Sequence, residues 1–246
     1  MGSDKSILIE GIVINTVDYR DYDKIITVFT KDRGKLQFSA RGVRKINSKN
    51  RSSIDIFIYG EYLLSKGKAY YILNQGKTID AFRYLRTDLL KTAVAMTINM
   101  FLLNILYENN AQKEIFSLYL WTLKHLEKSR DPRMLLRYFL VKAILFLGHK
   151  PPLADCHYCG EKQGSFFYDF NDGILSCGNC RKRGFEIESQ LLELYKALEI
   201  DDFNYLRSQS YNKNSLEKFD YFLGKLIEDL TDKKFTGFDY LKKLIF

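Results

Sequence analysis

Four cysteines are the residues whose type and spacing point most clearly to chemistry. They occur as two CxxC pairs separated by seventeen residues, and the chain has no other cysteine. A CxxC turn presents two thiolates at the separation that tetrahedral zinc requires, and zinc is the usual reason for such pairs in a protein that is not secreted. The pattern predicts one zinc ion bound by Cys156, Cys159, Cys177 and Cys180.

The same spacing predicts a structural metal and not a catalytic one. Four thiolates fill the coordination shell of zinc, whereas a catalytic zinc keeps one position open for water or substrate. His149 and His157 are nearby alternative ligands, but no HExxH or HxE motif accompanies the cysteines. Asn171-Asp172-Gly173 is a hairpin turn signal between the two pairs, so we expect a zinc ribbon at residues 153–186.

A basic stretch is the second candidate site. The segment RGVRKINSKNR, residues 41–51, contains five cations and no acidic residue. Like charges at this density repel one another unless something neutralises them, and a polar loop suits phosphate backbones, which are bound mainly through charge. The alternative is a solvated surface connection. We expect nucleic-acid phosphates to contact Arg41, Arg44, Lys45, Lys49 and Arg51.

The distribution of charge agrees with a polyanion as ligand. The 246-residue chain has a formal net charge of +8. Residues 1–80 and residues 81–155 each carry +5, whereas residues 156–246 carry −2. A basic surface of this kind is typical of nucleic-acid binding. No segment reads as a signal peptide, and the most apolar run, residues 94–107, is too short to span a bilayer, so we expect a cytoplasmic protein without a membrane partner.

Residues 6–80 read as five short strands with no helix. The segments SILIEGIVINTV, KIITVFT, KLQFSARG, IDIFIYGEYLLS and KAYYILNQGKTI are rich in β-branched and aromatic residues and are separated by turn signals. They predict a small antiparallel barrel, with the five-stranded OB-fold as the leading candidate and an SH3-like barrel as the alternative. Five aromatic residues could stack bases or fill the barrel core: Phe38, Tyr59, Tyr62, Tyr70 and Tyr71.

Beyond residue 80 the apolar residues recur at helical spacing. The first helix is expected to bury Leu85, Leu89, Leu90, Ala93, Met96 and Met100. Further helices are expected at 112–128, from Asp131-Pro132 to Gly148, and at 188–198, 215–230 and 238–245. The fold class is therefore α+β and multidomain: an OB-fold at 1–80, then a helical domain at 81–246 that embeds the zinc ribbon.

Motifs of common enzymes are missing. The chain has no GxxxxGK[ST] phosphate loop, no GxSxG elbow and no GxGxxG after a strand. His125, the histidine outside the cysteine region, falls on an expected helix and has no partner in the sequence for acid–base chemistry. We therefore expect no enzymatic activity. The competing hypothesis is a metal-dependent nuclease that uses Asp18, Asp21 and Asp23, although these residues also suit a solvated turn.

The order of these parts resembles the bacterial RecO family of recombination mediators. The N-terminal likeness lies in EGIVINTVDYRDYDKIITVFTKDRGKLQFSARGVRK. A second lies in FLVKAILFLGHKPPLADCHYCG with the returning CGNC, and DLLKTAVAMTINMFLLNILYENNAQKEIFSLYLWTLKHLE resembles the helical bundle of the family. Together these segments cover nearly the whole chain, although the basic loop is richer in Asn and Ser than the family pattern.

The resemblance implies a non-enzymatic protein of DNA repair. Members of this family bind single- and double-stranded DNA, anneal complementary strands, work with RecR, and help to load RecA onto strands covered by the single-stranded-DNA-binding protein SSB. By motif, it assigns the four cysteines to zinc and adds Lys31, Arg33 and Lys35 to the DNA-binding candidates. It also implies a pocket for the acidic tail of SSB in the helical region. We place that pocket, as a hypothesis, at Arg133, Arg137 and Lys142.

One rival class uses the same parts. An OB-fold combined with a zinc ribbon also occurs in adaptors that act on RNA or on a polymerase. A preference for structured RNA over single-stranded DNA, together with failure to bind SSB, would favour the adaptor. In bacteria, a recombination mediator would work in the cytoplasm and join the nucleoid during repair.

Overall fold

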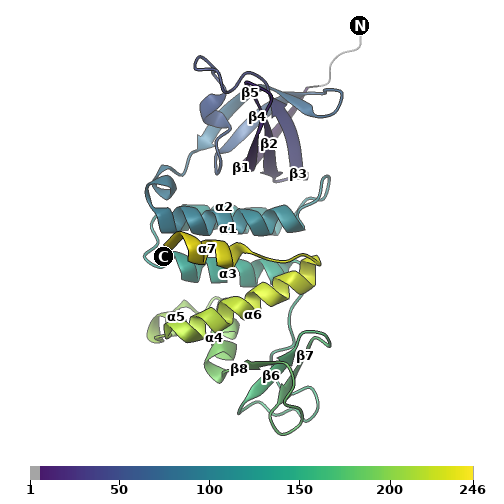
Figure 1. Cartoon of the computed structure of the whole chain (residues 1–246), viewed down its shortest axis with the longest axis vertical. Coiled ribbons are helices and arrows are strands. Elements are labelled where there is room, and N and C mark those ends of the chain that lie inside the picture. Colours follow the sequence, from purple (N-terminus) through teal and green to yellow (C-terminus); the bar gives the residue numbers. More distant parts are fainter. Residues whose placement is uncertain (1–5, 246) are drawn as a thin grey trace. The chain divides into compact units, whose positions relative to one another are not determined.

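The computed structural model describes residues 6–245 and divides into two compact units, residues 1–130 and residues 131–246 (Figure 1). The first unit contains a closed barrel of five strands in the order β1-β2-β3-β5-β4. All neighbouring pairs are antiparallel except β3 and β5, which are parallel. This is the OB-fold order, so that prediction is confirmed and the SH3-like alternative is set aside. The strands are β1 (Ile7–Tyr19), β2 (Asp23–Thr30), β3 (Gly34–Ala40), β4 (Tyr59–Ser65) and β5 (Tyr71–Asp80).

Buried and half-buried residues alternate along β3, which shows why this segment forms a strand of the barrel. Leu36, Phe38 and Ala40 are buried, whereas the residues between them are half-buried on the outer face, as expected for a strand with one side in the core. The long strand β1 closes the barrel because it pairs with β4 through its first half and with β2 through its second. Gly11 lies where both pairings meet. A Cβ atom there would lie 2.6 Å from the carbonyl oxygen of Phe29, so only glycine fits.

Helices follow the barrel within the first unit. They are the 3-10 helix η2 (Arg83–Thr87), α1 (Leu89–Ile105) and α2 (Lys113–Leu126). The side chain of Asp88 accepts a hydrogen bond from the amide of Lys91 and so caps α1. The expected apolar face of α1 is only partly correct, because Leu89 is exposed and Met96 and Met100 are half-buried. Residues on nearly every side of this helix are apolar, so the sequence periodicity could not select the buried face.

A buried polar network joins the barrel to both helices. The Asn99 side chain on α1 donates a hydrogen bond of 3.0 Å to the carbonyl oxygen of Ile14 on β1. The Tyr119 hydroxyl on α2 donates one of 2.5 Å to the Asn99 side-chain oxygen. Burial raises the pKa of Tyr119 well above its ordinary value, so the hydroxyl keeps its proton and remains a donor. One asparagine therefore satisfies polar groups on two other elements of the unit.

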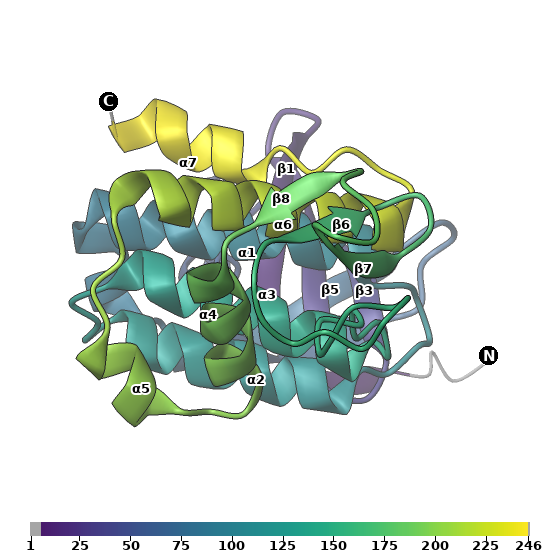
Figure 2. The ribbon, with the colours of Figure 1, turned by 90° about the horizontal axis from the view of Figure 1, so that it is seen from below.

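The second unit holds five helices and a three-stranded sheet. In Figure 2, α7 lies beside α6, and α4 and α5 belong to the same unit. The sheet has the order β7-β6-β8 and carries the cysteine pairs. The elements are α3 (Pro132–Phe146), β6 (Phe166–Asp169), β7 (Ile174–Cys177), β8 (Phe185–Ile187), α4 (Ser189–Glu199), α5 (Phe203–Ser208), α6 (Lys213–Thr231) and α7 (Gly237–Ile245).

Most of these elements agree with the sequence prediction. Asp131 caps α3 by accepting from the amide of Met134, with Pro132 in the first turn, and Gly148 after the helix has a φ of +80°. The sequence reading missed α5, which buries no residue and so gives no apolar periodicity. It also missed β8, which is only three residues long.

The domain boundary expected between residues 80 and 81 stays a prediction. The barrel ends with β5 at Asp80, yet α1 and α2 group with the barrel in the unit of residues 1–130. Within residues 6–245 no helix is long and apolar enough to cross a bilayer.

We predict that Asn99→Ala lowers the free energy of unfolding by about 2–4 kcal/mol, because it removes two buried hydrogen bonds, one to the Ile14 carbonyl and one from the Tyr119 hydroxyl. Urea denaturation followed by circular dichroism measures the change. Asn104→Ala is the matched control, since Asn104 lies on the same helix but is half-buried and makes no such bond. Equal effects of the two substitutions would contradict the role given to Asn99.

Candidate nucleic-acid interface and metal centre

The four cysteines come together as one group of potential metal ligands. Their Sγ atoms all lie within 4.8 Å of one another, with Cys156 and Cys177 buried and Cys159 and Cys180 exposed. Each pair forms a tight turn: the amide of Gly160 donates to the Cys156 carbonyl at 2.8 Å, and the amide of Cys180 donates to the Cys177 carbonyl at 3.1 Å. In the described part of the chain no histidine joins this group.

The electrostatics of the group suit a cation. Burial opposes ionisation of Cys156, but amide hydrogen bonds, first from Cys177, outweigh it and lower the pKa of this thiol to about 6. Hydrogen bonds with the Cys159 and Cys177 sulfurs raise the pKa of Cys180 to about 12. Sulfurs this close cannot all carry a negative charge unless a positive ion compensates them. The donor set therefore fits a thiophilic divalent metal, which would deprotonate all four.

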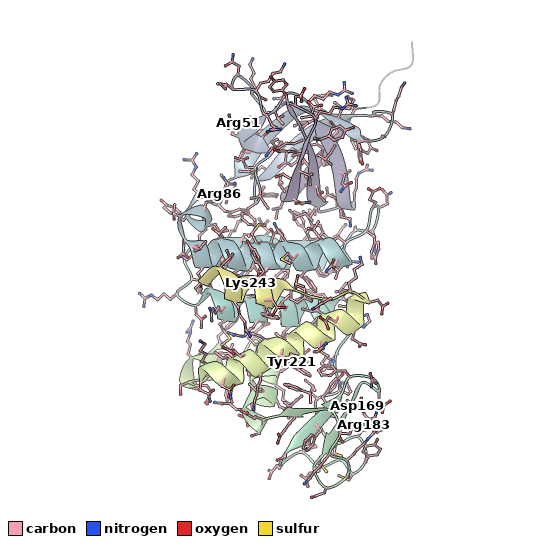
Figure 3. The ribbon with its side chains drawn as sticks, in the orientation of Figure 1. Arg51, Arg86, Asp169, Arg183, Tyr221 and Lys243 are labelled. Carbon is pink, nitrogen blue, oxygen red and sulfur yellow. The ribbon has the colours of Figure 1, made fainter. Side chains whose placement is uncertain are left out.

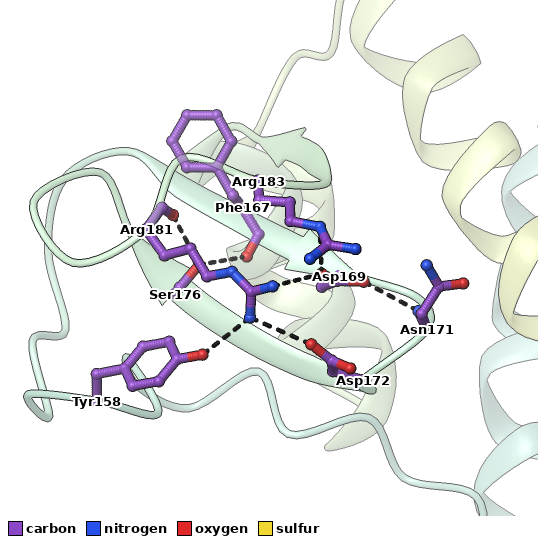
Figure 4. Close-up of polar contacts among 8 residues, drawn as sticks. All are labelled: Tyr158, Phe167, Asp169, Asn171, Asp172, Ser176, Arg181 and Arg183. Atoms are coloured by element: carbon purple, nitrogen blue, oxygen red, sulfur yellow. Dashed lines mark hydrogen bonds and ion pairs between the residues drawn. The ribbon is translucent and has the colours of Figure 1, made fainter.

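Two arginines after the second cysteine pair, Arg181 and Arg183, form ion pairs within the ribbon. Figure 4 shows the Arg181 guanidinium between Asp169, Asp172 and Tyr158. Its nitrogen atoms lie 3.5 Å from the Asp169 carboxylate and 3.1 Å from that of Asp172, and Arg183 lies 3.3 Å from Asp169. Asp169 is buried, so these arginines compensate its charge. This arrangement gives Arg181 and Arg183 a structural role.

The basic loop lies between β3 and β4, as predicted, and the β1–β2 loop anchors its base. The Asp23 carboxylate accepts a hydrogen bond of 2.8 Å from the Gly42 amide. Asp18 lies 3.4 Å from the Arg44 guanidinium, which also donates to the Asp21 carbonyl at 3.2 Å. These aspartates therefore hold the loop, and they are not among the metal-ligand groups of the described residues.

The remaining loop cations face solvent. Arg41, Lys45, Lys49 and Arg51 are exposed, and Figure 3 shows Arg51 pointing away from the barrel. The Lys45 ammonium lies 5.3 Å from the centre of the Tyr22 ring. Ile46 at the tip of the loop is 91% exposed. The loop thus combines free cations with exposed apolar and aromatic surface.

The other three DNA-binding candidates lie at the opposite end of the β2–β3 hairpin. Lys31 and Arg33 are exposed in its turn, whereas Gly42 and the basic loop begin where β3 ends. Lys35 is half-buried, and its ammonium lies 3.4 Å from the Leu103 carbonyl. The seven residues of β3 separate the two groups by about 23 Å at 3.3 Å per residue. The structure therefore does not gather the eight candidates at one point.

Two adjoining hollows connect these groups along the outer side of β3. The larger, of about 630 Å³, is lined by residues of the β1–β2 loop, by Arg41 and by the β4–β5 loop. The smaller, of about 360 Å³, is lined by Arg33, Lys35 and the same β4–β5 loop. Residues 66–70 line both, and we call the pair of hollows the barrel groove. The side chains that make it basic and aromatic are Tyr19, Arg20, Arg33, Arg41, Lys66, Lys68 and Tyr70.

The sequence reading found only part of this groove. Phe38 and Tyr62 fill the barrel core, and the Tyr59 hydroxyl donates to Glu10, so these aromatic residues do not serve as stacking platforms. Tyr70 is exposed and lines the groove. Arg20, Lys66 and Lys68 were missed because each stands in a short turn without a run of charge. These three residues could have been predicted from the OB topology, because the β1–β2 and β4–β5 loops border the usual binding face of this fold.

The residues expected to receive a partner are largely engaged inside the second unit. Arg137 is 3% exposed, and its guanidinium donates two hydrogen bonds, of 2.7 and 2.9 Å, to the Asp220 carboxylate. The Lys142 ammonium donates to the Glu199 carbonyl and the Asp201 carboxylate. Arg133 is half-buried on the same helix. Helical spacing correctly placed Arg133, Arg137 and Lys142 on one helix. It could not show that Asp220 of α6 compensates Arg137, or that Asp201 of the α4–α5 turn compensates Lys142.

The barrel of OB topology with a basic groove, together with a helical part that carries a four-cysteine ribbon, defines the class of OB-fold proteins that act on nucleic acid. The chain belongs to the RecO family. The family model for the recombination protein O N terminal matches residues 5–82, and the model for its C terminal matches residues 86–236. This membership gives the protein a role in DNA repair and recombination.

Relatives from several bacteria support the same assignment. The chain is 35% identical over 171 residues to the DNA repair protein RecO of Bacillus pumilus, a match that covers 70% of this chain and 67% of the relative. It is 29% identical over 229 residues to the RecO protein of Syntrophomonas wolfei, covering 92% of both chains. It is 28% identical over 236 residues to that of Bacillus subtilis, covering 95% of this chain and 90% of the relative.

Proposed function

We propose that this protein is a non-enzymatic recombination mediator that binds single-stranded DNA in the barrel groove and anneals complementary strands. The observation that carries the proposal is the groove itself, where five exposed cations and two exposed tyrosines line one side of an OB barrel. Cations neutralise phosphates, and exposed aromatic rings stack on bases of any sequence. Annealing requires this neutralisation, because two strands repel each other before they pair.

The geometry suits a strand that follows β3. A backbone entering beside Arg41 and Arg20 would pass under Lys66 and Lys68 and leave near Arg33. Tyr19 lines the end nearer the basic loop and Tyr70 lines both hollows, so bases could stack on either ring. An OB-fold typically covers about 4–16 nucleotides, which is compatible with a path along one strand of this length. The exposed cations of the basic loop would extend the charged path beyond the groove.

Family membership supports the partners in this proposal. We propose that the protein works with RecR, contacts the acidic tail of SSB, and promotes RecA loading on SSB-coated strands in the cytoplasm and at the nucleoid. The basic helix α3 is the proposed place for the SSB tail. Arg133 is the better candidate there, because Arg137 and Lys142 already compensate carboxylates. The proposal requires no catalytic residue and no nucleotide.

We also propose that the four cysteines bind one structural zinc ion. The support is the four-sulfur donor set, which suits zinc and leaves no position open for substrate. The ribbon then connects α3 to α4 and contributes to the fold. Its arginines compensate Asp169, so DNA contact by the ribbon is not part of the proposal.

Removing two groove cations should weaken the salt dependence of DNA binding. Each phosphate contact on a single strand contributes about 0.7 to the slope of log K against log salt, so Lys66→Gln/Lys68→Gln should lower the slope by about 1.4. Fluorescence anisotropy with an oligothymidine at several salt concentrations measures it. Lys77→Gln/Lys196→Gln removes the same charge outside the groove and should leave the slope unchanged.

An unchanged slope in the groove variant would contradict this binding site. Absence of oligonucleotide binding by the unmodified protein would contradict DNA binding as a whole. A clear preference for structured RNA over the same length of single-stranded DNA would favour the adaptor of RNA or polymerase. The first outcome therefore tests where the site lies, and the other two test which class of ligand binds.

Metal analysis should find about one zinc per chain, and Cys177→Ser should lose most of it, because a buried ligand of a filled tetrahedral shell is removed. Limited proteolysis of that variant should cleave first within the ribbon. His157→Ala is the control, since His157 lies beside the cysteines but outside the ligand group, and its zinc content should not change. Well under one zinc in the unmodified protein, or full zinc in Cys177→Ser, would overturn the assignment.

A further inference from the structure

A second basic surface lies on the first unit, where η2 meets the C-terminal end of α2. Glu127 joins the two elements. Its carboxylate accepts a hydrogen bond of 3.0 Å from the Tyr84 amide, and its carbonyl accepts one of 2.8 Å from the Lys91 ammonium. Five exposed cations surround this junction, and we call them the η2–α2 surface: Arg83, Arg86, Lys124, Lys128 and Arg130.

The charges of the η2–α2 surface are not compensated inside the protein. Among the described residues none of its five cations has a carboxylate within 4.0 Å. Arg86, labelled in Figure 3, donates to the Ile56 carbonyl, which is neutral. These segments contain two acidic residues: Asp88 caps α1, and the Glu127 carboxylate accepts from the Tyr84 amide at the junction itself. The five cations therefore outnumber the carboxylates on this surface. Clustered cations of this kind attract a polyanion.

Exposed aromatic rings accompany these cations. Tyr84, between Arg83 and Arg86 along the chain, is 72% exposed. On α2 the exposed His125 ring stacks on Trp121 with 3.8 Å between the ring centres. Flat rings beside unpaired cations are the combination that binds single-stranded nucleic acid, because bases stack while phosphates are neutralised. An acidic peptide would be recognised by the charges alone.

This surface is separate from the barrel groove. Asn109, which lines the groove, precedes α2, whereas Lys124 and Lys128 lie at the other end of that helix. A helix of 14 residues is about 21 Å long at 1.5 Å per residue. That length corresponds to about six nucleotides at the 3.4 Å spacing of one strand in a B-form duplex, and to fewer in an extended single strand. A short strand in the groove would therefore leave the η2–α2 surface free.

We propose that the η2–α2 surface is a second binding site for single-stranded DNA, so that one chain holds two strands at once. The inference rests on the proposed function and gives annealing a geometry: both strands are neutralised on the same compact unit before they pair. The network of Asn99, Ile14 and Tyr119 ties α2, one of the two helices of this surface, to the barrel of the groove. Each strand is held through phosphates and stacked bases, so either site accepts any sequence.

The test counts strands per chain with hexathymidines that carry a donor or an acceptor dye. The unmodified protein should bind two per chain and show energy transfer between them. Arg83→Gln/Lys124→Gln/Lys128→Gln should bind one, lose the transfer, and keep the affinity for the first strand within about twofold, because the groove is untouched. Annealing of long complementary strands should slow by about tenfold in this variant. Lys196→Gln/Lys233→Gln/Lys234→Gln removes the same charge from the second unit and should behave like the unmodified protein.

Tyr84→Ala gives a second variant that keeps every charge. Its ring is exposed, so the fold should be unaffected, and it should weaken the second strand without changing the salt slope. One strand per chain in the unmodified protein, or two in the triple variant, would overturn the second site while leaving the groove in place. Failure of the unmodified protein to bind any strand would instead overturn the proposed function.

Discussion

Asn99 satisfies polar groups on β1 and α2 from a position inside α1, and both proposed DNA sites depend on that arrangement. A buried amide is costly unless its hydrogen bonds are made, so the three elements can pack well in only one relative placement. The barrel groove and the η2–α2 surface lie on elements that this network connects. Their separation is therefore a property of the folded unit, which a flexible linker between two sites could not provide.

Several acidic residues in this protein hold a basic residue or the base of the basic loop in place. Asp23 and Asp18 hold the base of the basic loop, Asp169 holds two arginines in the ribbon, and Asp220 holds Arg137 inside the helical unit. Among the described residues of the first unit, most cations without a carboxylate within 4.0 Å line the groove or lie in the basic loop or on the η2–α2 surface. A net charge of +8 alone would not reveal this division. It follows from which cations are already paired in the fold.

The sequence predicted those features that depend on local spacing. Two CxxC pairs predict a four-cysteine group, and alternation in Leu36, Phe38 and Ala40 predicts the inner face of β3. The sequence did not predict those features that depend on contacts between residues far apart in the chain. The buried face of α1 could not be chosen from an all-apolar helix, and Arg137 resembled a surface cation until Asp220, 83 residues away, was seen beside it. Lys66 and Lys68 join Arg20 only because the barrel closes.

Photo-crosslinking tests the central claim, that single-stranded DNA lies in the barrel groove, most directly. A short oligonucleotide containing iododeoxyuridine would be irradiated with the unmodified protein, and the modified peptides identified by mass spectrometry. Such crosslinks form with aromatic rings that stack on the base, so the account predicts adducts at Tyr19 and Tyr70. Adducts confined to the ribbon at residues 153–186, with none in the barrel, would contradict it.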